Sequence, residues 1–170
     1  MKNALKLLFI SALLVAGPVL MAQDYKFGHI NSSQLLRIMP EREQAQKKLQ
    51  EEIQSLSETL DELQVEYNKK LQAYVEAQEN LSNTVRQLRE SELRELQNRM
   101  QQFQATAQED IQQREIELMQ PIFEKIENTI AEVARERGYI YVFDLDGNSV
   151  LYFSDDSEDV FPFVREKMGI

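Results

Sequence analysis

The sequence predicts an α+β protein in which a long antiparallel coiled-coil helical hairpin projects from a small, oligomer-forming β body. Three observations lead to this prediction. No glycine interrupts residues 29–137, where Gln, Glu, Leu, Lys and Arg dominate, and such a stretch is typical of long helices. Within it, apolar residues recur in alternating steps of four and three, which is the heptad pattern of a coiled coil. Aromatic and β-branched residues gather near the two ends, so a small sheet is expected from both ends of the chain.

The first 22 residues form a predicted export signal. Lys2 and Lys6 supply its positive charge, an apolar run follows over residues 7–16, and Ala22 is the expected last residue before cleavage. The run is too short to cross a bilayer, because a membrane-spanning helix needs about 20 apolar residues. We therefore predict that residues 1–22 are removed and that the mature chain is exported.

Charge and cysteine content exclude several classes of function. The chain carries 29 acidic and 19 basic residues, for a net charge of −10. Removal of the export signal takes away two lysines and no acid, which leaves −12. A surface this acidic argues against nucleic-acid binding, which needs lysine and arginine against phosphates. Because the chain has no cysteine, it has neither disulfides nor thiolate metal sites.

The helical hairpin is predicted over residues 41–121. Its two apolar seams are close to mirror images of each other about residue 89. Folding the chain there brings Leu71 opposite Ala107, including a step in each seam where the heptad pattern slips. We therefore predict an antiparallel hairpin with its apex near residues 88–91.

A second apex is possible at Thr84, where Thr84 and Gln87 have the spacing of a helix-capping box. Folding there is expected to place Leu60 opposite Thr106, which buries a polar group at a cost in free energy. The sequence therefore favours the apex near residues 88–91.

The β body is predicted from residues 23–40 and 122–170, which flank the arm. Asp146 and Gly147 give a hairpin-turn signal between two of its strands. The predicted elements are strands at 25–30, 139–144 and 149–154, and short helices at 32–39 and 160–168.

One face of the predicted sheet lacks a cover within the chain. The segments YIYVF and VLYF are apolar on both faces, so both faces of the sheet are expected to be buried. The chain's own helices can cover only one of them, and we predict that the other is a subunit interface. The residues expected at this interface are Phe27, Ile30, Ile140, Val142, Val150 and Tyr152.

Possible catalytic motifs do not support an enzyme, and no catalytic or metal-binding residue and no cofactor is predicted. The segment VFDLDGN resembles the DxDG signature of haloacid-dehalogenase-type phosphatases, but only 26 residues follow Asp144, too few for that fold. The same residues fit a calcium-binding EF-hand loop poorly, because Ser149 stands where such loops need glycine. His29, the single histidine, has no cysteine or second histidine beside it for catalysis.

The order of segments resembles that of the Skp/OmpH family of chaperones. A first strand (KFGHIN) and a short helix (SSQLLRIM) precede the long hairpin. A strand pair (GYIYVFDLDGNSVLYFS) and an acidic segment with a final helix (DDSEDVFPFVREKMG) follow it. The resemblance covers nearly the whole mature chain and rests on this order rather than on an invariant motif.

The resemblance implies a homotrimer, a periplasmic location, and ATP-independent capture of unfolded outer-membrane proteins. Under this resemblance, the predicted β body is the part of the chain that forms the trimer. The best-known enterobacterial members are basic whereas this chain is acidic, so binding to lipopolysaccharide is not carried over. Contact of the arm tips with a membrane stays open, because arginines slightly outnumber glutamates near residues 86–99.

Under this reading the function is that of a holdase, a chaperone that binds unfolded outer-membrane proteins and prevents their aggregation. The alternative is a structural or tethering coiled-coil protein of the cell envelope. Soft apolar side chains on the arm are candidates for client contact, although their spacing is explained equally by packing in the seam. These candidates are Tyr67, Tyr74, Met100 and Phe103.

Overall fold

The computed structural model describes residues 25–170, and the predicted export signal lies outside this part of the chain. Within residues 25–170, no helix has both the length and the apolar character needed to span a membrane. The elements in chain order are β1 (Lys26–Ile30), α2 (Ser32–Ile38), α3 (Pro40–Ala77), α4 (Asn83–Arg137), β2 (Tyr139–Asp144), β3 (Glu158–Asp159) and α5 (Phe161–Met168).

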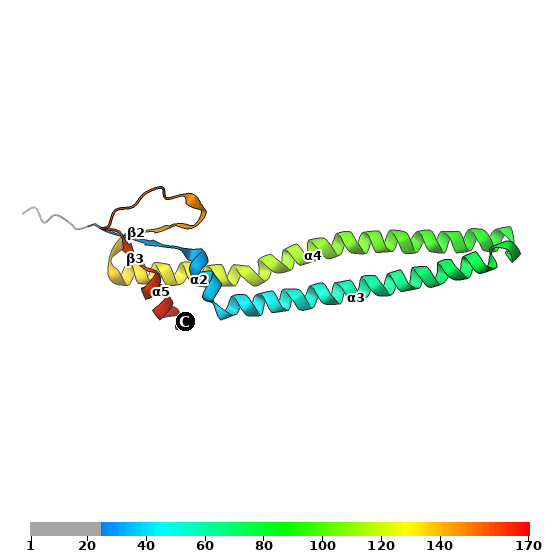
Figure 1. Ribbon diagram of the computed structural model, residues 1–170, viewed down its shortest axis with the longest axis horizontal. Coiled ribbons are helices and arrows are strands. Elements are labelled where there is room, and N and C mark those ends of the chain that lie inside the picture. Colours follow the sequence, from blue (N-terminus) through cyan, green and yellow to red (C-terminus); the bar gives the residue numbers. More distant parts are fainter. Residues whose placement is uncertain (1–24) are drawn as a thin grey trace, which may run out of the picture.

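Helices α3 and α4 lie side by side and form an arm that extends from a small base (Figure 1). The 38 residues of α3 span about 57 Å at about 1.5 Å per residue. The base holds a three-stranded sheet and the two short helices. The predicted fold class, a helical hairpin projecting from a small β body, is therefore confirmed, whereas trimerisation stays a prediction.

Local signals explain where the helices of the arm begin and end. Pro40 lies in the first turn of α3, where a backbone N–H would have no partner inside the helix. Helix α4 begins after Ser82, whose side chain accepts a hydrogen bond from the N–H of Val85 at 3.4 Å. It ends at Gly138, which adopts a φ of 75° and donates its N–H to the carbonyl of Ala134.

The chain turns at residues 78–82 rather than at the predicted 88–91. Helix α3 ends at Ala77, a 3-10 turn follows, and the chain is helical again from Asn83. The predicted apex therefore lies inside α4 and is wrong. The turn beside Thr84, which the sequence analysis rejected, is nearly the true one.

Hydrogen bonds across the arm show the register of the two helices. The Tyr74 hydroxyl donates to Glu90 Oε1 at 2.8 Å. One heptad further from the turn, Gln97 Nε2 donates to the Tyr67 hydroxyl at 2.8 Å. The contacts advance by seven residues on each helix, as expected for an antiparallel coiled coil.

This register separates Leu71 from Ala107. Leu71 lies between Tyr67 and Tyr74 and therefore faces the turn of α4 that contains Leu93. Ala107 follows Leu93 by 14 residues, or about 20 Å along the helix. The predicted pairing is wrong because a heptad pattern matches itself after every shift of seven residues. The seams alone therefore cannot select one register.

The observed turn does not place Leu60 opposite the polar Thr106, as was expected for a turn beside Thr84. In the observed register, one heptad beyond the contact between Tyr67 and Gln97, Leu60 comes beside Phe103 instead. The true turn therefore buries apolar residues as well as the predicted one does.

The three strands form a parallel sheet in the order β2-β1-β3. The predicted strand at 149–154 and its hairpin with β2 are wrong, because this segment is a loop and the third strand is β3. Gly147 has the positive φ of 73° expected of a turn glycine, but the chain does not reverse along β2. Instead, the N–H of Leu145 donates to the carbonyl of Ile30 at 2.8 Å, so the chain continues beside β1.

One face of the sheet packs on the base end of α4. Gly28 of β1 has no room for a side chain, since a Cβ would lie 2.8 Å from Val160 Cγ1. The predicted helices at 32–39 and 160–168 are confirmed as α2 and α5. Ile122 is the first α4 residue in this core, and we therefore keep the proposed division between arm and body beside Pro121. The core side chains are Ile30, Leu35, Met39, Ala45, Ile122, Ile126, Val133, Tyr139, Val160 and Val164.

Candidate functional site

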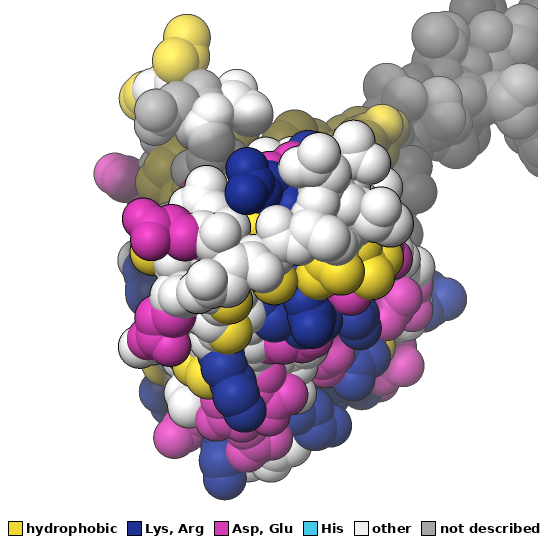
Figure 2. Space-filling model, turned by 90° about the vertical axis from the view of Figure 1, so that its right-hand side faces the viewer, with side chains coloured by type: hydrophobic (Ala, Val, Ile, Leu, Met, Phe, Trp, Pro, Cys, Tyr) yellow, Lys and Arg dark blue, Asp and Glu magenta, His cyan; other side chains and the backbone are white. Residues whose placement is uncertain are grey.

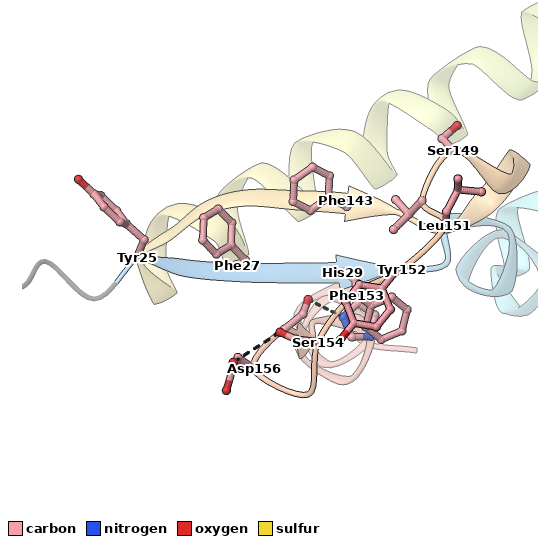
Figure 3. Close-up of a pocket in the computed structure, with 12 residues that line it drawn as sticks. Tyr25, Phe27, His29, Phe143, Ser149, Leu151, Tyr152, Phe153, Ser154 and Asp156 are labelled. Atoms are coloured by element: carbon pink, nitrogen blue, oxygen red, sulfur yellow. Dashed lines mark hydrogen bonds between the residues drawn. The ribbon is translucent and has the colours of Figure 1, made fainter.

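The opposite face of the sheet carries a row of aromatic side chains, which we call the open face (Figure 3). The ring of Phe27 is parallel to that of Tyr141 within 5°, with the centroids 6.4 Å apart. Tyr141 in turn lies 5.9 Å from Phe143. All three rings are exposed. Gly28 and Ile30 of β1, which alternate with Phe27, are buried on the other face, and Val142 of β2 packs against the core there.

The loop at 145–157 stands over the open face and adds further apolar side chains (Figure 1). Leu151 is 95% exposed and Tyr152 is 82% exposed. Between this loop and the strands lies a hollow of about 530 Å³. Phe27 and Phe143 line its sheet side, and Phe153 lines its loop side (Figure 3).

His29 links the loop to the sheet at the edge of this hollow. Its ring stacks on Phe153, with the centroids 4.2 Å apart, and its Nδ1 lies 2.9 Å from the Ser157 hydroxyl. These contacts give His29 a structural role, as the sequence predicted. The described residues contain no group of three His, Cys, Asp or Glu side chains placed to hold a metal ion.

The open face has the properties of an unsatisfied interface. A large exposed apolar patch on a soluble protein is a common sign of a protein contact. The outer edge of β2 also has no neighbouring strand within the described chain, because β1 occupies only its inner edge. An unpaired edge of this kind can accept a strand from another chain.

The predicted interface residues divide into three groups. Phe27, Ile140 and Tyr152 are exposed, and Val150 lines the hollow. Val142 packs against the core and is half-buried. Ile30 is only 1% exposed, inside the core of its own chain. Its assignment to the interface is wrong, because Ile30 points to the face that α4 covers.

Sequence reasoning missed part of the open face. The aromatic residues alternate along β2 with the core-facing Val142, and this two-residue period was the available signal. The loop residues gave no periodic signal because they form no strand. The missed residues are Tyr25, Tyr141, Phe143, Leu151 and Phe153.

The four predicted client-contact residues lie on the seam of the arm. Each of Tyr67, Tyr74, Met100 and Phe103 is half-buried, so each packs in the seam and still offers part of its surface. The hydrogen bond with Glu90, together with loss of solvent, raises the pKa of Tyr74. The two tyrosines therefore help to hold the helices together.

Other apolar side chains of the two long helices are exposed. Val65, Val75 and Ile116 lie off the heptad pattern, which was the signal that could have identified them, whereas Leu71, Val85 and Leu88 belong to the predicted seam. Viewed from the tip of the arm, hydrophobic side chains show between interspersed acidic and basic ones (Figure 2). The exposed apolar residues of the two long helices are Val65, Leu71, Val75, Val85, Leu88, Ile116 and Phe123.

Asp144, the residue of the phosphatase-like motif, connects β2 to α2. One carboxylate oxygen accepts a hydrogen bond from the N–H of Ser32 at 3.1 Å and from that of Asp146 at 3.0 Å. The other accepts from the Ser32 hydroxyl. Burial acts to raise the pKa of Asp144, but these hydrogen bonds outweigh it and the net pKa is lowered. The carboxylate is thus a structural acceptor.

We predict that Asp144→Asn weakens the dependence of stability on pH. Because the folded pKa is lowered, the ionised carboxylate stabilises the fold above the ordinary Asp value of 3.8, and this contribution is lost as the pH falls through the folded pKa. The side chain is partly exposed, so the expected difference is small, about 0.5 kcal/mol. Urea unfolding over a series of acidic pH values measures it. Asp155→Asn is the control, and equal pH slopes for the two variants would contradict the prediction.

Comparison with known proteins agrees with the architecture. The family model described as outer membrane protein (OmpH-like) matches residues 26–168. The chain is also 28% identical over 150 residues to the chaperone protein Skp of Vibrio cholerae serotype O1, which covers 85% of this chain and 87% of that protein. That relative is described as a chaperone and not as an enzyme, in agreement with the expectation from sequence. Since the family model spans nearly all the described residues, the chain belongs to the OmpH-like family.

Proposed function

We propose that this chain is an ATP-independent holdase chaperone of the periplasm, which binds unfolded outer-membrane proteins as a homotrimer and prevents their aggregation. The observation that carries the proposal is a projecting arm with exposed apolar side chains, joined to a base whose open face lacks a cover. The description of the Vibrio cholerae relative as a chaperone supports it.

Assembly through the open face accounts for the exposed aromatic residues. Covering Phe27, Tyr141 and Phe143 with the same face of other copies removes a large apolar area from water, at about 25 cal/mol per Å². The loop at 145–157 and the free edge of β2 supply further contacts. Three copies joined at their bases direct three arms away from a common centre and enclose a space for a client.

The arms are suited to many weak contacts rather than one tight one. Exposed apolar side chains such as Val65, Val75 and Leu88 are spread along both helices and do not form a deep pocket. Several such contacts on each of three arms give a high combined affinity through multivalency. Binding of this kind prevents the exposed strands of the client from pairing with those of other chains. Release requires no nucleotide if the membrane offers the client a greater burial of apolar surface.

Contact between the arm tip and a membrane stays part of the proposal, although the charges near the tip are largely engaged within the arm. Arg86 donates to the carbonyl of Gln78 at 3.1 Å, and Arg89 pairs with Glu92 at 3.0 Å. The Gln78 carbonyl and Glu92 therefore reduce the positive charge that is available to bind anionic lipid.

Light scattering tests the proposed function directly. A urea-unfolded outer-membrane β-barrel protein is diluted into buffer with and without the purified mature chain. A holdase is expected to suppress the rise in scattering at a ratio near one trimer per client, without ATP. Molar mass from size-exclusion chromatography with light scattering is expected to be three times that of the monomer. A structural or tethering coiled coil leaves the aggregation unchanged, and that result would falsify the chaperone assignment.

A further inference from the structure

A shallow groove runs along α4 where the arm meets the base. Three hollows of about 240, 560 and 150 Å³ adjoin one another there. Glu115 and Met119 line the first two, and Phe123 and Glu127 line the last two. We call this surface, over residues 115–130 of α4, the basal groove.

The floor of the basal groove is apolar and lies outside the coiled-coil seam. Ile116 is 58% exposed and Phe123 is 46% exposed, with the half-buried Met119 between them. Their spacing of three and four residues places all three on one side of α4. Among residues 25–170 no other helix covers this side, since all three side chains line the same open hollow.

The rim of the basal groove is acidic. Glu115, Glu124 and Glu127 line the largest hollow, and none of them forms a salt bridge within residues 25–170. Asp144 and Asp146 add two carboxylates at the base end, whereas Arg42 is the basic residue that lines the arm end. The neighbouring Lys125 does not neutralise the rim, because it pairs with Glu41.

We propose that the basal groove binds an extended segment of the client in which apolar side chains are flanked by lysine or arginine. The apolar floor accommodates the central side chains, and the acidic rim attracts the flanking positive charges. A second copy of this chain is a poor occupant by comparison, because its net charge of −10 brings acid against acid. The inference rests on the proposed holdase function and adds a charge preference to it.

Two matched peptides test the charge preference. They share the same central leucine, valine and tyrosine residues and carry either lysines or glutamates at both ends, with a fluorescent label. Fluorescence anisotropy with the full mature chain is expected to show that the lysine peptide binds about tenfold more tightly in low salt. The difference is expected to shrink in about 0.5 M NaCl, because salt screens exposed charges.

Two sets of substitutions assign the preference to the groove. The triple change Glu115→Gln, Glu124→Gln and Glu127→Gln is expected to reduce the tenfold preference to about twofold. The triple change Glu58→Gln, Asp61→Asn and Glu62→Gln removes the same charge from the middle of the arm and is expected to leave the preference intact. Ile116→Ser with Phe123→Ser is expected to weaken both peptides, and because both side chains are exposed the fold is retained.

Three outcomes overturn the inference. The first is that the two peptides bind equally well. The second is that the triple change in the middle of the arm reduces the preference as much as the triple change in the groove. The third is that Ile116→Ser with Phe123→Ser lowers the molar mass and leaves peptide affinity unchanged. The last result assigns the groove to another copy of the chain. The scattering assay on the wild-type protein separates this inference from the proposed function. Suppressed aggregation without a charge preference refutes only the groove, whereas unsuppressed aggregation refutes the holdase.

Discussion

Phe27→Asp is expected to separate the proposed trimer into monomers, with the molar mass falling threefold. Phe27 lies on the open face, against Tyr141 and at the wall of the hollow under the loop. A carboxylate buried there between copies has no basic partner, and burial of an unpaired charge costs several kcal/mol. The subunit itself is expected to stay folded, because Phe27 points away from its core. Size-exclusion chromatography with light scattering gives the mass, and circular dichroism gives the helix content.

Ile38→Asp is the matched control for this change. Ile38 is an exposed apolar residue of α2 and does not belong to the open face. The control is expected to keep the mass of the trimer. If Phe27→Asp also keeps that mass while remaining helical, the open face is not the interface between copies.

A shortened arm is expected to weaken holdase activity about tenfold without disturbing the base. Removing residues 61–74 and 90–103 deletes two heptads from each helix and preserves the register seen between Tyr67 and Gln97. Each arm loses about 21 Å, and with it all four seam residues proposed to contact clients. Because the proposed affinity depends on many contacts along the three arms of the proposed trimer, about tenfold more protein is expected to be needed to suppress aggregation.

A full-length variant separates length from side chains. Replacing Tyr67, Tyr74, Met100 and Phe103 with leucine keeps the arm long and its seam apolar. If this variant retains activity and the shortened one loses it, the length of the arm is the decisive property. Full activity of a correctly assembled short-armed protein would contradict the proposed mechanism.

The elements that the sequence predicted correctly are those with a strong local signal. The long helices follow from the absence of glycine over residues 29–137 and from their apolar seams. The α2 and α5 helices were short but well bounded. In each case the deciding interaction lies within one turn of the residue concerned.

The errors arose where distant contacts decide between equal local alternatives. The predicted and the observed registers of the arm differ by 14 residues, or two whole heptads, so their seams match equally well, and the cap at Ser82 was not weighed. The Asp146–Gly147 signal describes a local bend, but the bond from Leu145 to Ile30 decides where the chain goes next. A sequence pattern contains no information on that bond.

The sequence also predicted the open face incompletely, because it fixed neither the face of each strand nor the conformation of the loop. Phe27 lies on the open face, where an interface stays a prediction, while Ile30 was assigned to the wrong face of the same strand. The two residues differ by an odd number of positions, so a strand places them on opposite faces. The exposed Leu151 and Tyr152 depend on a loop conformation that no periodicity describes.

The parallel pairing of β1 with β2 has a consequence for how the protein forms. Phe27 and its neighbour Tyr141 are separated by the entire arm, so the sheet contains contacts of very high sequence separation. Such contacts slow folding, whereas the helical hairpin closes through a short turn and can form early. A newly made chain is therefore expected to carry a finished arm on an unfinished base. The rate at which copies become competent to assemble is then set by the arrival of β2 and β3 at β1.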